Sequence, residues 1–171
     1  HVIVVTMENR SFDHLLGWLP GADGKQAGLT YTDAAGTAYP THHLTDFQGC
    51  GFADPSHSFE GGRIEYNGGA CDGWLRAETN DVYAIGYYAA GDLAFLGRAA
   101  PEWTVLDRYF APFLGPTNPN RLILQAGQTD RIANTPGFST LPTIFDRLAE
   151  AGLTGKNYGY HLVGSANWKE A

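Results

Sequence analysis

Apolar residues along the chain fall into short runs that are divided by long polar, glycine-rich stretches. The first run, Val2–Val5, is β-branched throughout, which is typical of a strand buried on both faces of a parallel sheet. Residues 103–106 and 156–160 have the same strand-like character. We therefore predict strands at these three positions.

Three stretches carry the spacing and the end signals of helices. Ser11 can cap a short helix that Gly17 ends. Residues 83–100 predict a helical segment that stops before Pro101. Residues 142–152 give the clearest helix, because apolar residues share one face, a proline opens the segment and a glycine closes it.

Strands that alternate with helices predict an α/β fold with a largely parallel sheet. Residues 19–81 are instead rich in Gly, Asp, Thr and Asn, and we expect a long, loop-like excursion there. The chain has 171 residues, which suits one domain with a sizeable core. We predict a single domain over residues 1–171, without internal repeats.

The stretch 107–122 is the most distinctive in the sequence. Its two central prolines fix their own φ and push the residues before them, Gly115 and Asn118, out of the helical region. We expect a helix to begin here with Asn118 as N-cap and Pro119 in the first turn. Thr117 would lie just ahead of free N–H groups that favour an anion, where its hydroxyl could attack a phosphate. The alternative is a rigid surface turn whose threonine bonds its own backbone.

Two other positions could carry chemistry. Glu8 and Asn9 follow the first predicted strand, where ligands gather in open α/β sheets, and their oxygen atoms suit a hard cation. The alternative for this pair is a solvated turn. His57 follows a turn start and could stabilise a phosphoryl oxygen or protonate a leaving group; the alternative is an ordinary surface histidine.

Composition narrows the range of partners. The net charge is −7, from 11 Lys and Arg against 18 Asp and Glu, and the basic residues are scattered, which argues against a nucleic acid. A bound cation would still allow a phosphate substrate. No apolar run approaches the ~20 residues that span a bilayer. Cys50 and Cys71 either form a disulfide or are two separate thiols.

Five motifs, in order, together resemble the bacterial phosphoesterase family that includes phosphatidylcholine-preferring phospholipases C and an acid phosphatase branch. They are Met7–His14, Asp54–Ser58, Tyr87–Leu96, Asp107–Arg121 and Thr143–Leu148. The resemblance covers nearly the whole chain. It implies an alkaline-phosphatase-like three-layer α/β/α sandwich, of which we expect this chain to be the N-terminal portion.

The resemblance also implies roles for single residues. Thr117 would be the nucleophile and would form a phosphothreonine intermediate, with His57 and Asn9 at the phosphoryl group. Glu8, Asn9 and Thr117 would be ligands of a divalent metal ion. A threonine at position 117 favours the phospholipase C branch, which cleaves phosphodiesters of phospholipids, over the phosphatase branch. The family further implies a secreted or periplasmic protein whose signal sequence has been removed.

The sequence also departs from the family pattern. A later segment with paired aspartates completes the metal site in the family, and no such segment precedes Ala171. Three ligands leave a hard cation short of its usual roughly six oxygens, so we expect weak metal binding and slow or no turnover. Gly155 stands where the family commonly has a tryptophan. An acid phosphatase, a non-catalytic remnant and a sulfatase-like hydrolase on the same fold are the alternatives.

Overall fold

The computed structural model describes residues 1–7, 10–47 and 51–158. It divides into two compact units, one of His1–Ser56 with Ile64–Tyr109 and one of His57–Arg63 with Phe110–Ala171. Its elements, in chain order, are α1 (Phe12–Leu16), β1 (Thr30–Thr32), β2 (Ala38–Pro40), β3 (His42–His43), α2 (Phe59–Tyr66), η1 (Asn67–Gly69), η2 (Val82–Ile85), β4 (Gly86–Tyr87), η3 (Ala90–Asp92), α3 (Leu96–Ala99), α4 (Thr117–Ala126) and α5 (Ile144–Glu150). The described part is thus α/β, with small sheets and short helices.

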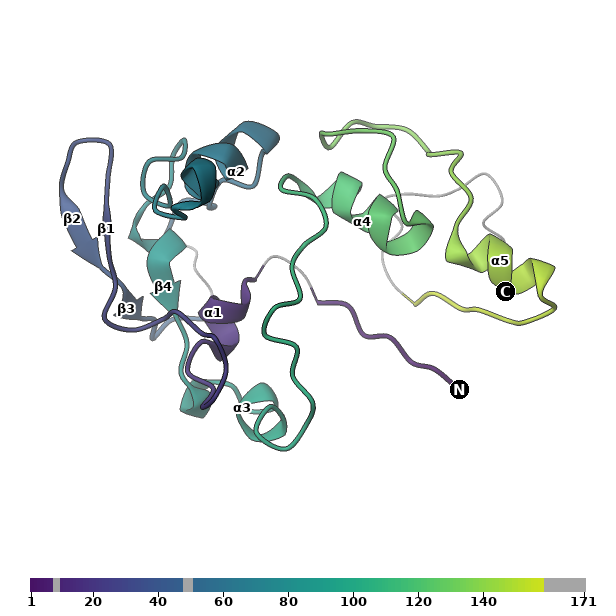
Figure 1. Ribbon diagram of the computed structural model, residues 1–171, viewed down its shortest axis with the longest axis horizontal. Coiled ribbons are helices and arrows are strands. Elements are labelled where there is room, and N and C mark those ends of the chain that lie inside the picture. The colour runs from purple at the N-terminus through teal and green to yellow at the C-terminus, as the bar shows by residue number, and fades with distance from the viewer. Residues whose placement is uncertain (8–9, 48–50, 159–171) are drawn as a thin grey trace. The chain divides into compact units, whose positions relative to one another are not determined.

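The first unit contains two small sheets. β1 and β2 form an antiparallel hairpin in which Tyr31 lies opposite Tyr39 (Figure 1). β3 and β4 pair in parallel, with His42 opposite Gly86. α1 packs beside β4, and the backbone N–H of Tyr88 donates to the carbonyl of His14 at 2.9 Å. The three-layer sandwich that the resemblance implies stays a prediction.

The core of this unit is built around two tyrosines. Leu44, Tyr83 and Tyr88 are buried together, and Leu15 and Leu93 pack against them. Leu15 belongs to α1, and the start of this helix is fixed by a local contact. The hydroxyl of the N-cap Ser11 accepts a hydrogen bond from the backbone N–H of His14 at 3.1 Å. The predicted cap of this helix is therefore confirmed.

The His14 side chain is half-buried beside the two tyrosines of this core. Its ring meets Tyr88 edge-on at 5.1 Å between centroids, and its Nδ1 lies 3.0 Å from the carbonyl of Gly86. Its Nε2 is buried without a partner in the described part of the chain. Burial, and secondarily the charge of Arg10, hold the pKa of His14 below its usual 6.5, although the Gly86 carbonyl raises it.

We expect the free energy of unfolding to decrease as the pH falls below about 6.5, because the unfolded chain takes up a proton that the folded histidine excludes. The contribution is fully present above the unfolded pKa. Denaturant titrations at pH 7.5, 6.5 and 5.5 measure it. The His14→Asn variant keeps a donor for Gly86 but does not titrate. In this variant the part of the pH dependence of the unfolding free energy that comes from His14 should disappear. An identical slope in both proteins would contradict the assignment.

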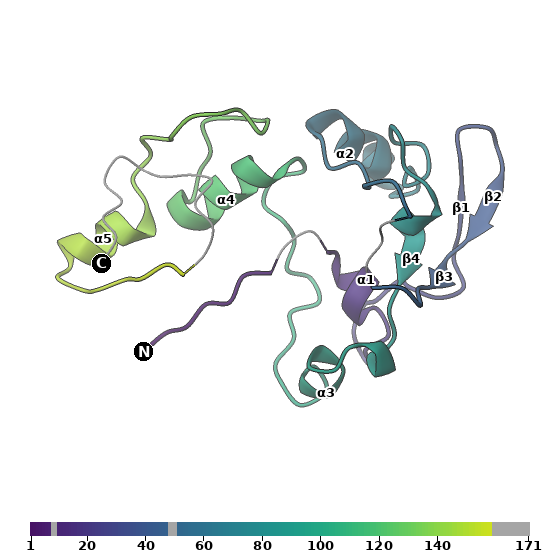
Figure 2. The same cartoon turned by 180° about the vertical axis from the view of Figure 1, so that it is seen from behind.

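The predicted strand at Val2–Val5 is wrong. These residues have no strand assignment, and their exposure runs from 76% at Val4 to 92% at Val2. The segment runs as an extended trace from the N-terminus (Figure 2). A β-strand is defined by hydrogen bonds to a neighbouring strand, and none of the described strands pairs with residues 2–5.

The predicted strand at residues 103–106 is also wrong, and the one at 156–160 is described only in part. After α3 the backbone N–H groups of Glu102 and Trp103 both donate to the carbonyl of Ala99, so the chain turns where a strand was expected. Residues 156–158 have no strand assignment, and 159–160 lie outside the described residues. The predicted helical stretch 83–100 is broken into η2, β4, η3 and α3.

Residues 19–81, which were predicted to be a long loop, contain strands and helices. The β1–β2 hairpin, β3, α2 and η1 all lie within it. Cys71 follows η1 as an exposed free thiol, whereas Cys50 lies outside the described residues. None of the helices in the described ranges combines the length and the apolar character that a membrane span requires.

The second unit contains the best-predicted helix. α5 begins after Thr143, whose hydroxyl pairs with the backbone N–H and the carboxylate of Asp146 in a capping box. Hydrogen bonds from the Thr143 backbone and then its side chain hold the pKa of Asp146 below its usual range. The helix is followed by Gly152 at φ +69°, a conformation that suits glycine. α5 packs against α4.

Candidate active site

Thr117 is the first residue of α4. Pro116 occupies the N-cap position with φ −73° and ψ −178°, so the helix begins directly after it. Asn118, predicted as the N-cap, is instead a buried residue of the first helical turn, because Pro116 already has the extended backbone that an N-cap needs. Pro119 lies in the first turn as expected. The nucleophile candidate thus stands at the helix N-terminus.

The missing cap of α4 is supplied from a later loop. Pro116 has no side-chain oxygen, and the backbone N–H of Asn118 donates to Oδ1 of Asn134 at 2.8 Å. Arg131 fixes this loop, since its guanidinium donates to the carbonyls of Thr135 and Gly137 at 3.2 and 3.0 Å. One N–H group of the helix start is therefore already bonded to the protein.

The loop is anchored at its base by a carboxylate. Asp130 accepts from Nε of Arg131 at 2.7 Å and from the hydroxyl of the buried Ser139 at 2.8 Å. Hydrogen bonds from Arg131 and then Ser139 hold the pKa of Asp130 below its usual range. The loop that delivers Asn134 to the helix start is thus tied down by charge-assisted bonds.

The turn before Thr117 is held by the side chain of Asn120. Its Nδ2 lies 3.0, 3.1 and 3.0 Å from the carbonyl oxygens of Phe113, Gly115 and Pro116, and its Oδ1 accepts from the N–H of Phe113 at 3.2 Å. One amide therefore joins the first turn of α4 to the chain that leads into it.

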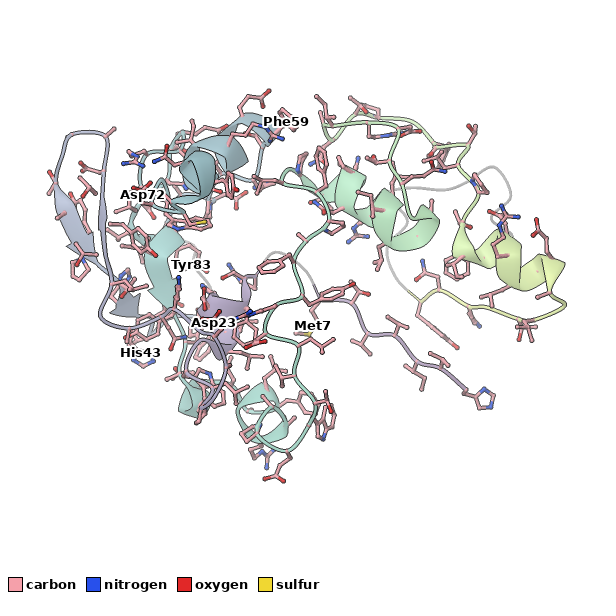
Figure 3. The ribbon with its side chains drawn as sticks, viewed as in Figure 1. Met7, Asp23, His43, Phe59, Asp72 and Tyr83 are labelled. Atoms are coloured by element: carbon pink, nitrogen blue, oxygen red, sulfur yellow. The ribbon has the colours of Figure 1, made fainter. Side chains whose placement is uncertain are left out.

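The segment carrying His57 packs against the same turn. Figure 3 shows Phe59 at the start of α2, and its ring stacks on Phe113 with centroids 5.8 Å apart. Arg63 lies over the Phe59 ring, 3.1 Å from its centroid, and donates to the carbonyl of Leu114 at 3.1 Å. His57 is exposed and belongs to the same compact unit as Thr117. Two of the predicted catalytic residues are therefore carried by one unit.

The Thr117 side chain is accessible. The residue is half-buried, and within the described ranges its hydroxyl has no hydrogen-bond partner, so the self-bonded threonine of the alternative interpretation is not seen. Glu8 and Asn9 lie outside the described residues. The described residues contain no group of three His, Cys, Asp or Glu side chains that could hold a metal ion.

Sequence reasoning missed the residues that hold this site. Asn120 is a poor helix former in an interior position, and that mismatch is the one local signal of its role. The sequence around Asn134 and Arg63 does not indicate their roles, because the groups that they bind are distant along the chain.

A model of the phosphoesterase family matches residues 1–169. The chain belongs to the phosphoesterase family. Among similar proteins, the non-hemolytic phospholipase C of Pseudomonas aeruginosa is 31% identical over 92% of this chain and 26% of its own length. Phospholipase C B of Mycobacterium tuberculosis is 30% identical over 98% of this chain and 39% of its own. Non-specific phospholipase C1 of Arabidopsis thaliana is 28% identical over 90% of this chain and 33% of its own length.

The chain thus spans between 26% and 39% of the length of these three relatives. It shares their family over nearly its whole extent. The family assignment made from the five motifs is confirmed. The activities in the relatives' names belong to proteins of which this chain matches 26% to 39%.

Proposed function

We propose that this chain carries the nucleophile of a metal-dependent phosphoesterase of phospholipase C type, which cleaves phospholipid phosphodiesters through a phosphothreonine at Thr117. The observation that carries the proposal is the threonine hydroxyl at the start of a ten-residue helix, without a partner in the described part of the chain. Family membership supports phosphoester chemistry, and the names of the three relatives favour a phosphodiester over a phosphomonoester.

The proposed reaction has two steps. Oγ of Thr117 gives its proton to a solvent water and bonds to phosphorus, while the bond from phosphorus to the glycerol oxygen breaks and His57 gives that oxygen a proton. Water then hydrolyses the phosphothreonine, which releases the phosphorylated head group and restores the hydroxyl. The helix dipole favours the negative charge that develops beside Thr117.

The metal dependence rests on the family resemblance. A divalent cation with Glu8, Asn9 and Thr117 among its ligands would supply positive charge to the phosphoryl oxygens. Asn9 would also donate to one of those oxygens. Export from the cytoplasm belongs to the same proposal and rests on the same resemblance.

The test compares two chromogenic substrates with one leaving group, a phosphocholine diester and a phosphate monoester, with the full-length protein before and after chelation. We expect the diester to be hydrolysed faster, the chelator to abolish the activity and added divalent metal to restore it. Mass spectrometry of acid-quenched enzyme should find the phosphoryl adduct on Thr117. Preference for the monoester would establish the acid phosphatase alternative, and no activity with either would establish the remnant.

A further inference from the structure

The four backbone groups that meet the Asn120 amide belong to the short turn 113–116. Residues 113–115 belong to no helix or strand, so their polar groups lack the partners that regular structure provides, whereas the carbonyl of Pro116 is that of the N-cap of α4. Asn120 supplies both kinds of partner, because the two N–H groups of its Nδ2 are shared among three carbonyl oxygens and its Oδ1 accepts from one N–H.

One of these bonds bears directly on Thr117. The carbonyl of Pro116 belongs to the peptide unit whose nitrogen is that of Thr117, and it lies 3.0 Å from Nδ2 of Asn120. Fixing this carbonyl orients the peptide plane from which the threonine side chain departs. The bonds to Phe113 and Gly115 tie that plane to the turn on which Phe59 stacks.

Only an amide can fill this position. An aspartate has the same shape but accepts only, and it would face three carbonyl oxygens with no proton to offer. Alanine removes the bonds without adding a charge. The two changes therefore separate the loss of the contacts from the repulsion.

We propose that Asn120 is a positioning residue for the nucleophile: its side-chain amide fixes the turn 113–116 and thereby the direction of the Thr117 hydroxyl. This inference rests on the proposed function of Thr117. Asn120 acts through the backbone and touches no reacting atom. Because catalysis by a positioned nucleophile depends steeply on its geometry, loosening the turn should slow attack and leave substrate affinity nearly unchanged.

The experiment measures kcat, KM and the number of active sites for the chromogenic phosphodiester, with the active sites counted from the initial burst of leaving group. We expect Asn120→Asp in the full-length protein to lower kcat per active site roughly 100-fold, the scale of a small misplacement of reacting groups. KM should change little. Asn120→Ala should show the same pattern and covers the case in which the aspartate variant does not fold.

Leu122→Ala is the matched control, because Leu122 is a buried residue of the same helix that makes none of these bonds. It should lower the melting temperature but leave kcat per active site unchanged. If Asn120→Asp or Asn120→Ala keeps a normal kcat per active site while Thr117→Ala is inactive, the positioning role is overturned and the nucleophile stands. If Thr117→Ala keeps full activity, the proposed function fails, whatever the Asn120 variants do.

Discussion

Replacing Thr117 by alanine is expected to lower phosphodiester hydrolysis by roughly 10³-fold or more, the scale seen when a nucleophile is removed. The substitution deletes the hydroxyl at the first position of α4, and no group of the described chain is hydrogen-bonded to that hydroxyl. The fold should therefore lose little stability while the covalent step is lost. Steady-state assays of purified wild type and variant, with circular dichroism to establish folding, give the comparison.

Thr117→Ser is the natural control for this change. A serine keeps an oxygen at the same position and loses one methyl group, so we expect activity well above that of the alanine variant. The phosphoryl adduct should move to the new hydroxyl and be absent from the alanine protein. An alanine variant as active as the wild type would remove Thr117 from the mechanism.

The largest effect on stability is expected at Gly73. A methyl group built there would lie 1.8 Å from the backbone carbonyl oxygen of Ile64 and 2.6 Å from its carbon, distances at which the backbone must shift. The N–H of Gly73 also donates to the carbonyl of Glu65 at 3.2 Å, so a shift breaks a hydrogen bond. We expect Gly73→Ala to cost about 3 kcal/mol.

Thermal unfolding measures this cost as a decrease in melting temperature of roughly 6–12 °C. Gly91→Ala serves as the control, because Gly91 is exposed and an added methyl group meets no atom within 4 Å. That variant should melt close to the wild type. Equal melting temperatures for the two variants would show that the chain at Gly73 relaxes without cost.

The helix ends were predictable because their causes are local. Ser11 lies three residues before the N–H that it caps, and the segment containing Thr143 carries its start signals within four residues. Strands have no such local cause. Val2–Val5 has ideal strand composition and no described partner, so composition alone misled the prediction.

The candidate site likewise has a part with local causes, which the sequence predicted, and a part that depends on distant contacts, which it did not. Two prolines around Thr117 predicted a helix start, and the error was confined to which residue caps it. Pro116 took the N-cap position, and Asn134 supplied the missing side-chain oxygen from 16 residues beyond Asn118. Packing between distant segments decides such a contact, and no spacing in the sequence encodes it. The roles implied for Glu8 and Asn9 stay predictions, and both lie outside the described residues.

The turn before Thr117 is held by hydrogen bonds to its main-chain atoms, beside the stacking of Phe59 on Phe113. Asn120 contacts the backbone of Phe113, Gly115 and Pro116, and Arg63 reaches the carbonyl of Leu114. The Leu114 side chain takes no part in these bonds and is 45% exposed. Replacing Leu114 by another residue therefore leaves these hydrogen bonds in place, because each of them is made by a backbone atom of the turn.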